Sequence, residues 1–365
     1  MLSNTIMVSP KDRIRHFLKE LVEKGIDLAL VSTPVNLRYL TGVRLETFER
    51  FGALLVCVRS DEVTLIVPKL DEGKALITGL PYLTYLDQEG PINAVKKAVS
   101  RCSGVRVVGF EGSAPIRHLW VLRDVLGEFR DETIDPVLAG MRIVKDEDEL
   151  GSIKAAVKAI EEGLRAAKDT IKAGVTEAWL ARVISNVIAE AGAVPRDVLV
   201  QSGPNSAIPH WLPGNRRIQQ GDVIVIDVTA TYNDYYGDLT RTFVLDEAPI
   251  EFNRVYNLVK EAHDEAIKAV KAGVTGAFID SVAREVISRS GYGEYFIHRT
   301  GHGIGLEVHE EPYISGDYNK PLPRGSVFTI EPGIYLPGKF GVRLESNVAI
   351  RLNGEVEVLD TYWPY

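Results

Sequence analysis

The hydrophobic pattern of residues 10–134 alternates between helical and strand-like segments. Apolar residues recur every three or four positions from Pro10 to Gly25, which predicts an amphipathic helix. Short continuous apolar runs, typical of buried strands, follow it. In chain order, we expect helices over 10–25, 70–77, 92–100 and 116–126, strands over 28–31, 51–58, 62–67 and 105–110, and a turn or short helix over 36–42. This alternation predicts a self-contained α/β domain with a mixed sheet.

A different pattern begins after Asp135-Pro136, a dipeptide that is typical of a break in the chain. An apolar stripe over residues 145–171 predicts one long helix, and acidic residues fill its first turns, where the helix dipole favours them. Because 365 residues exceed the usual size of a single core, we expect two domains, residues 1–135 and 136–365.

A repeated pentapeptide indicates that the second domain contains a duplication. Lys-Ala-Gly-Val-Thr occurs at 172–176 and again at 271–275, each time between two amphipathic helices. Further along, a glycine stands six residues before Asp227, and another stands six residues before Glu331, each ahead of an apolar run. Two landmarks in the same order predict two related helix–helix–sheet halves that share one sheet region.

Composition and charge narrow the function classes only slightly. The chain is 45% hydrophobic and 25% charged, as in ordinary globular proteins, and its net charge of −8 argues against a nucleic-acid-binding surface. No long apolar segment and no signal-peptide pattern are found, so we expect no membrane association and a cytoplasmic location. Cys57 lies in an apolar run and is expected to be buried, and nothing in the sequence indicates that it is bridged to Cys102.

Four carboxylates and one imidazole form the candidate chemistry. Asp227 and Glu331 each end an apolar run, where a carboxylate needs a partner because it loses hydration. Asp238 and Glu345 follow them across turn-like loops, so each acid pair is expected on adjacent strands. Carboxylates opposed at ~5 Å repel each other unless a metal ion lies between them. Together with His302, these oxygen-rich groups suit Mn, Co, Zn or Fe.

Glycines and histidines surround these acids. The spacing of Gly301-His302-Gly303-Ile304-Gly305 does not fit a phosphate-binding loop, so we expect the glycines to permit close backbone approach around the histidine. His210, His298 and His309 fall in two short segments that flank the acids, and we interpret them jointly as surrounding the site, although a single histidine is more often structural. The histidines expected on helices among charges, from which we expect no function, are His16, His118 and His263.

This set of residues resembles the metal-binding pattern of the pita-bread metallopeptidases, which include methionine aminopeptidase, aminopeptidase P and prolidase. The local motifs at 237–242, 301–306 and 329–333 match that family, and the resemblance extends from about Lys145 to the C-terminus. Residues 36–42 resemble the creatinase-type domain that precedes the catalytic domain in prolidases and aminopeptidases P but not in methionine aminopeptidases. The resemblance implies an α+β pita-bread domain with a pseudo-two-fold repeat, preceded by a smaller α/β domain.

The same resemblance implies two divalent metal ions and a role for each residue. Asp227 would bind one ion, His302 and Glu331 the other, and Asp238 and Glu345 would bridge them. A bridging water would be the nucleophile, with Glu331 as proton shuttle. The residues implied around the substrate are His210 and His309, which would polarise the scissile carbonyl or stabilise the tetrahedral intermediate, and Arg343, near the substrate or behind the ligands.

The resemblance therefore implies a hydrolase that cleaves the bond before proline, first as an Xaa-Pro dipeptidase (prolidase) and alternatively as an Xaa-Pro aminopeptidase on longer peptides. A homodimer is expected from the family. The rivals are a metal-free creatinase-type enzyme and a catalytically silent binding module, both of which usually lose ligand residues. Two departures are Ser346, where many relatives carry an acid, and Tyr313, where some archaeal prolidases carry an arginine that holds the dipeptide carboxylate. The second departure leaves room for longer substrates.

Overall fold

The structure is a computed structural model that describes residues 9–361 and 363. Contacts divide the chain into two compact units, residues 1–142 (unit 1) and residues 143–365 (unit 2). Within the described residues, no helix is both long enough and apolar enough to cross a membrane.

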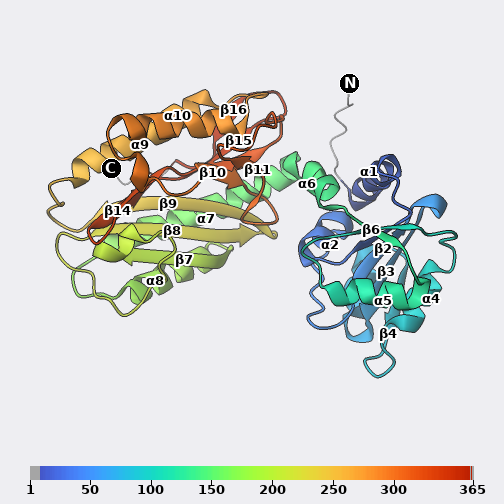
Figure 1. Cartoon of the computed structure of the whole chain (residues 1–365). Helices are drawn as coiled ribbons and strands as arrows, with labels where there is room; N and C mark the ends of the chain where they lie inside the picture. Colours follow the sequence, from blue (N-terminus) through green and yellow to red (C-terminus); the bar gives the residue numbers. More distant parts are fainter. Residues whose placement is uncertain (1–8, 362, 364–365) are drawn as a thin grey trace. The chain divides into compact units, whose positions relative to one another are not determined.

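Unit 1 is built on a six-stranded mixed sheet with the strand order β4-β3-β2-β1-β5-β6 (Figure 1). The central strand β1 pairs antiparallel with β2 and parallel with β5. The strands are β1 (Leu28–Val31), β2 (Ala53–Cys57), β3 (Glu62–Pro68), β4 (Tyr82–Tyr85), β5 (Val107–Phe110) and β6 (Arg130–Thr133). The helices are α1 (Pro10–Glu23), α2 (Pro34–Thr41), α3 (Glu72–Thr78), α4 (Ile92–Val99), α5 (Ile116–Leu126) and α6 (Asp135–Ile143), the last of which runs to the boundary of the unit.

The apolar pattern predicts the centre of this sheet correctly but not its edges. Every residue of β1 and β2 is buried, as expected of central strands that are covered on both faces. The edge strands β4 and β6 are half-buried or exposed, so no apolar run marks them in the sequence. Asp135 and Pro136 follow closely after β6 and begin α6, where proline is compatible with the first turn of a helix.

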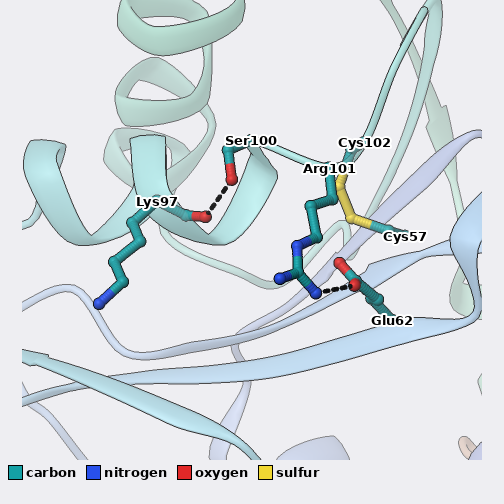
Figure 2. The surroundings of a disulfide bond; sticks show 6 residues. All are labelled: Cys57, Glu62, Lys97, Ser100, Arg101 and Cys102. Carbon is teal, nitrogen blue, oxygen red and sulfur yellow. Dashed lines mark hydrogen bonds and ion pairs between the residues drawn. A yellow bond between two sulfur atoms is a disulfide. The ribbon is translucent and has the colours of Figure 1, made fainter.

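A disulfide joins Cys57 to Cys102, contrary to the expectation from the sequence (Figure 2). Cys57 is buried at the end of β2, as predicted, and Cys102 lies just after α4. The two Cα atoms are 5.6 Å apart, within the range that a disulfide requires. The pairing has no local sequence signal, because the cysteines are 45 positions apart and meet only when α4 packs on the sheet.

Unit 2 contains two pairs of helices and three groups of paired strands. The helices α9 and α10 lie on one side of the strands and α8 on the other (Figure 1). The strands pair as β7-β8-β9, as β11-β10-β12-β15-β16 and as the hairpin β13-β14. The helices are α7 (Glu147–Thr170), α8 (Glu177–Glu190), α9 (Phe252–Ala269) and α10 (Gly276–Arg289). The strands are β7 (Val194–Ser202), β8 (Val223–Tyr232), β9 (Tyr235–Val244), β10 (Gly301–Gly303), β11 (Glu310–Ile314), β12 (Val327–Ile330), β13 (Gly333–Leu336), β14 (Phe340–Arg343), β15 (Ser346–Ile350) and β16 (Val356–Val358).

The two copies of the repeated pentapeptide have the same glycine conformation and form equivalent hydrogen bonds, each within its own half of the repeat. Gly174 and Gly273 have φ angles of 89° and 88°, a left-handed conformation that glycine adopts without steric cost. The first glycine donates to the carbonyl of Ile218, and the second donates to that of Leu322. The threonine that ends each pentapeptide caps the next helix, α8 or α10, and forms an isolated bridge to the chain ahead of β8 or β12. These matching hydrogen bonds confirm the predicted repeat.

We expect the disulfide to stabilise unit 1. Closing a loop between positions 45 residues apart removes chain entropy from the unfolded state, which corresponds to about 4 kcal/mol. Replacing Cys102 with serine should lower the temperature at which unit 1 unfolds in a calorimetric scan, and a reducing agent should have the same effect on the unsubstituted protein. A Ser100→Ala variant serves as the control for a change on the surface beside it. Two freely alkylated thiols in the unreduced protein would contradict the pairing.

Candidate metal centre

A cavity of about 440 Å³ in unit 2 brings the predicted site residues together. Its lining contains all five predicted metal ligands, the first and last of which are 118 residues apart in the sequence. These ligands are Asp227, Asp238, His302, Glu331 and Glu345. The other predicted site residues in the lining are His210, His298, His309 and Arg343. The cavity also contains residues that the sequence did not single out, among them Arg299.

Strand register places the two acid pairs. Asp227 lies in the middle of β8, not at the end of a strand as predicted, because β8 continues for five residues beyond it. It pairs with Thr240 of β9, so Asp238 is its diagonal neighbour on the same face. The last pair of β12 and β15 is Ile330 with Ser346, and therefore Glu331 and Glu345 follow directly where the two strands separate. Both halves of the repeat thus bring an acid pair to the cavity.

The glycines beside His302 permit the close backbone approach that the sequence predicts. A Cβ atom on Gly301 would collide with the carbonyl oxygen of Thr329, and one on Gly303 would collide with the carbonyl of Glu311. Both neighbours are backbone and cannot move aside like a flexible side chain. The glycines therefore let β10 lie between β11 and β12 and carry the imidazole to the acids.

Three side chains lie close enough together to share one metal ion. Asp238, His302 and Glu345 are all buried, and each offers a ligand atom within 4.8 Å of the others. Glu331 is adjacent, with its Oε1 3.2 Å from Nε2 of His302. Among the described residues, Oδ1 of Asp238 and Oε1 of Glu345 are buried and have no hydrogen-bond partner. Buried carboxylate oxygens without partners are costly, and a divalent cation would satisfy them, so the residues present fit a metal site.

The electrostatics of the cavity agree with this fit. Burial raises the pKa of Asp238 well above its ordinary value, and the neighbouring carboxylates raise it further, Glu345 most of all. Burial also raises the pKa of Glu345, with the charge of Glu331 as the next cause. Burial opposes ionisation of Glu331 as well, but the hydrogen bond and charge of His302 lower its pKa to about 2. Carboxylates crowded in this way repel one another unless a cation lies among them.

Arg343 orients the carboxylate of Asp227, the fourth acid in the cavity lining. Its Nη2 donates to Oδ2 of Asp227 at 2.6 Å, and its Nη1 donates to the hydroxyl of Tyr335 at 2.8 Å. The same hydroxyl lies 2.8 Å from Nε2 of His298. A chain of contacts therefore runs from His298 through the buried side chains of Tyr335 and Arg343 to Asp227, and it fixes the orientation of this carboxylate.

His309 lies directly beside His302, with ring centroids 4.2 Å apart in an edge-on arrangement. Burial lowers the pKa of His309 to about 4, and the charge of His302 contributes to the shift. The imidazole of His309 is therefore neutral near pH 7. His210 lines the same cavity from the segment between β7 and β8.

Asp360, which sequence reasoning missed, supports Glu345 from behind. Its Oδ2 accepts hydrogen bonds from Arg241 at 2.6 Å and from the Ser346 hydroxyl at 3.0 Å. The side chains of Arg241 and Asp360 are both completely buried, and the arginine also donates to the main-chain carbonyl of Glu345. The Ser346 hydroxyl lies 3.0 Å from Nε2 of His263, a buried histidine that lies on a helix beside the charge of Asp264, as the sequence predicts. A carboxylate from the C-terminal segment, that of Asp360, therefore stands next to Ser346.

Asn347 connects the carboxylate of Asp360 to Asp238, the other acid with an unpartnered oxygen. The main-chain N–H of Asn347 donates to Oδ1 of Asp360 at 3.2 Å. Its side chain accepts from the N–H of Asp238 and donates to the carbonyl of that residue, so it clamps both main-chain groups. Asp360 therefore positions Glu345 through Arg241 and Asp238 through Asn347.

The duplicated helix–helix–sheet unit, with acids and a histidine at its centre, defines a metallopeptidase of the pita-bread type. The chain belongs to metallopeptidase family M24, whose model matches residues 151–351, and the creatinase/prolidase N-terminal domain matches residues 13–144. The predicted fold class, a creatinase-type domain followed by a pita-bread domain, is confirmed.

Relatives extend over almost the whole chain. The Xaa-Pro dipeptidase of Pyrococcus furiosus is 34% identical over 354 residues, which are 96% of this chain and 98% of that one. The solved structure of a recombinant prolidase from Thermococcus sibiricus has a TM-score of 0.91 and 36% identity, and the match covers 98% of each chain. That of an X-Pro aminopeptidase from Thermotoga maritima has a TM-score of 0.83 and 36% identity, covering 93% of this chain and 97% of that one.

We expect Asp360→Asn to weaken metal binding, because the amide cannot hold Arg241 and the peptide of Asn347 as the carboxylate does. Loss of such support behind metal ligands typically costs about 10- to 100-fold in affinity. Calorimetric titration of the metal-free protein with Mn²⁺ measures the change, and circular dichroism shows whether the variant is folded. Asp317→Asn, at an exposed acid of unit 2, is the matched control. An unchanged Mn²⁺ affinity in a folded Asp360→Asn protein would remove Asp360 from this role.

Proposed function

We propose that this protein is an Xaa-Pro dipeptidase, a metal-dependent hydrolase that cleaves the bond before the proline of a dipeptide. One observation carries the proposal: Asp238, His302 and Glu345 converge in a buried cavity with two carboxylate oxygens unpartnered. It is supported by full-length relatives and solved structures whose names are Xaa-Pro dipeptidase or prolidase. We assign this activity to the C-terminal domain, which the sequence places at residues 136–365.

We propose that the cavity holds two divalent ions, of Mn, Co, Zn or Fe. Asp227 would bind one ion, His302 and Glu331 the other, and Asp238 and Glu345 would bind both. When bound, such ions make a water molecule acidic enough to attack a carbonyl at neutral pH. The ligand set is compatible with all four metals, since imidazole and carboxylate suit each of them.

Individual side chains would transfer the proton, bind the scissile carbonyl and orient a metal ligand. Glu331 would take a proton from the attacking water and give it to the departing proline nitrogen. That nitrogen belongs to a tertiary amide without an N–H, so it leaves as a secondary amine only after it has gained this proton. His210 and His309 would hydrogen-bond the scissile carbonyl oxygen as negative charge develops on it. Arg343 would act indirectly, through its ion pair with Asp227.

A second candidate function is that of an Xaa-Pro aminopeptidase on longer peptides. It is favoured by the 36% identity to the X-Pro aminopeptidase from Thermotoga maritima and by Tyr313 at a position where some dipeptidases carry arginine. The creatinase-type enzyme and the silent binding module are disfavoured, because all five predicted ligands are present in one cavity.

We further propose that the protein is a homodimer, as the family resemblance implies, and that it is cytoplasmic, as expected from the sequence. Disulfides are rare in the cytoplasm of mesophiles and common inside hyperthermophiles. The Cys57–Cys102 bond is therefore the observation with which a cytoplasmic location must be reconciled.

The deciding experiment compares three peptides after the protein has been loaded with Mn²⁺ or Co²⁺. We expect hydrolysis of Met-Pro, slower hydrolysis of Met-Pro-Ala and none of Met-Ala. Faster cleavage of the tripeptide would favour the aminopeptidase. The absence of any cleavage by metal-loaded protein would contradict both peptidase functions.

We expect Glu331→Gln to reduce kcat on Met-Pro by about 10²- to 10⁴-fold, because the amide cannot accept the proton of the attacking water. The change keeps the size of the side chain, so the fold should survive, which circular dichroism tests. The matched control is Glu294→Gln, at an exposed glutamate of unit 2. A kcat equal to that of the unsubstituted protein would exclude Glu331 as the proton carrier.

A further inference from the structure

Two arginines line the cavity, and they differ in their partners. Arg343 is fully engaged with Asp227 and its neighbours. Arg299 is half-buried in the cavity wall next to His298. Within residues 9–361 and 363, no acidic side chain lies within ion-pair distance of the Arg299 guanidinium. Arg299 therefore lacks a direct ion-pair partner among the described residues. Its charge is felt only at longer range by Asp317, whose pKa is lowered first by a hydrogen bond from a neighbouring hydroxyl and then by Arg299.

An aromatic ring holds this cation in place. The Arg299 guanidinium lies over the ring of Tyr313, 4.6 Å from its centroid. Tyr313 in turn packs edge-on against Tyr318, whose hydroxyl donates to Glu311. A guanidinium stacked on a ring keeps its N–H groups free along the edge, where they can form a paired contact with a carboxylate. Tyr313 is thus a support for Arg299 and is not itself part of the cavity lining.

The support also fixes Arg299 near the metal centre. Tyr313 of β11 pairs directly with His302 of β10, and side chains at paired positions stand on the same face of a sheet. Arg299 and His309 also line the same cavity as His302. A ligand group that reaches Arg299 is therefore next to the predicted catalytic residues.

The charges in the cavity limit which ligand group can bind to Arg299. Four carboxylates occupy the metal-binding part of the cavity, so an anionic end of a peptide would be repelled there without bound metal. In an Xaa-Pro dipeptide the carboxylate is attached to the proline ring, next to the nitrogen that leaves. In a longer peptide the same position carries an uncharged amide. Only the dipeptide can therefore offer Arg299 a charged group that is attached next to the leaving nitrogen.

We propose that Arg299 binds the C-terminal carboxylate of a dipeptide and thereby favours dipeptides over longer peptides at this site. The inference rests on the proposed function, because it assigns the leaving proline to the side of the cavity where Arg299 lies. The lack of an arginine at position 313 is then compatible with a preference for dipeptides, because the ring of Tyr313 orients Arg299 instead.

The test compares Met-Pro with Met-Pro amide, which has the same scissile bond but no carboxylate, in the Mn²⁺-loaded enzyme. We expect Arg299→Gln to raise KM for Met-Pro by about 10- to 100-fold, the usual loss for a charged hydrogen-bonded contact, and to leave kcat near that of the parent. KM for the amide should not change. Arg299→Lys should recover part of the loss, and Arg289→Gln, at an exposed arginine of α10, is the control.

A binding measurement separates this inference from the proposed function. Calorimetry with L-proline and L-prolinamide should show tighter binding of L-proline to the parent protein and no such difference in Arg299→Gln. Equal affinity for the two ligands in the parent, or an equal rise in KM for Met-Pro and its amide in the variant, would overturn the role of Arg299. Tighter binding of L-proline without any cleavage of Met-Pro would support the carboxylate site and overturn the dipeptidase function.

Discussion

The repulsion among buried carboxylates is the constraint on which the catalytic unit depends. Asp238 and Glu345 are buried with one oxygen of each unpartnered, and Glu331 lies beside them against His302. Such a cluster is unfavourable in a protein interior unless cations compensate it. Its position around a cavity, where an ordinary core would carry apolar residues, indicates a site that suits metal ions.

The repeat explains how one chain assembles such a cluster. Each half begins with the same glycine-containing turn, continues through a capped helix and delivers two acids on neighbouring strands. Strand pairing fixes the backbone, but the carboxylates still need orientation. Arg343 orients Asp227, while Asp360 orients Glu345 and Asp238 through Arg241 and Asn347. The precision of the site therefore depends on buried side chains, of which Arg241, Asn347 and Asp360 are not part of the cavity lining.

Much of the fold and of the site could be predicted from the sequence. The features that could not be predicted have physical reasons. Central strands, long helices and the repeat leave periodic or recurring patterns, and the ligand motifs lie within short glycine-rich segments. The edge strands β4 and β6 leave no apolar run, and the Cys57–Cys102 pair forms only through tertiary packing. Asp360 and Arg299 carry no local motif either. Their importance comes from contacts with residues distant in sequence or from what lies beside them in the cavity.

The most direct test of the account is the metal content of the protein after equilibrium dialysis against Mn²⁺. We predict two ions per chain in the parent protein and fewer than one in a protein with both Asp238→Asn and Glu345→Gln, with both proteins folded by circular dichroism. A parent protein that binds no metal, or a double variant that keeps both ions, would contradict the assignment of this cavity as the metal centre.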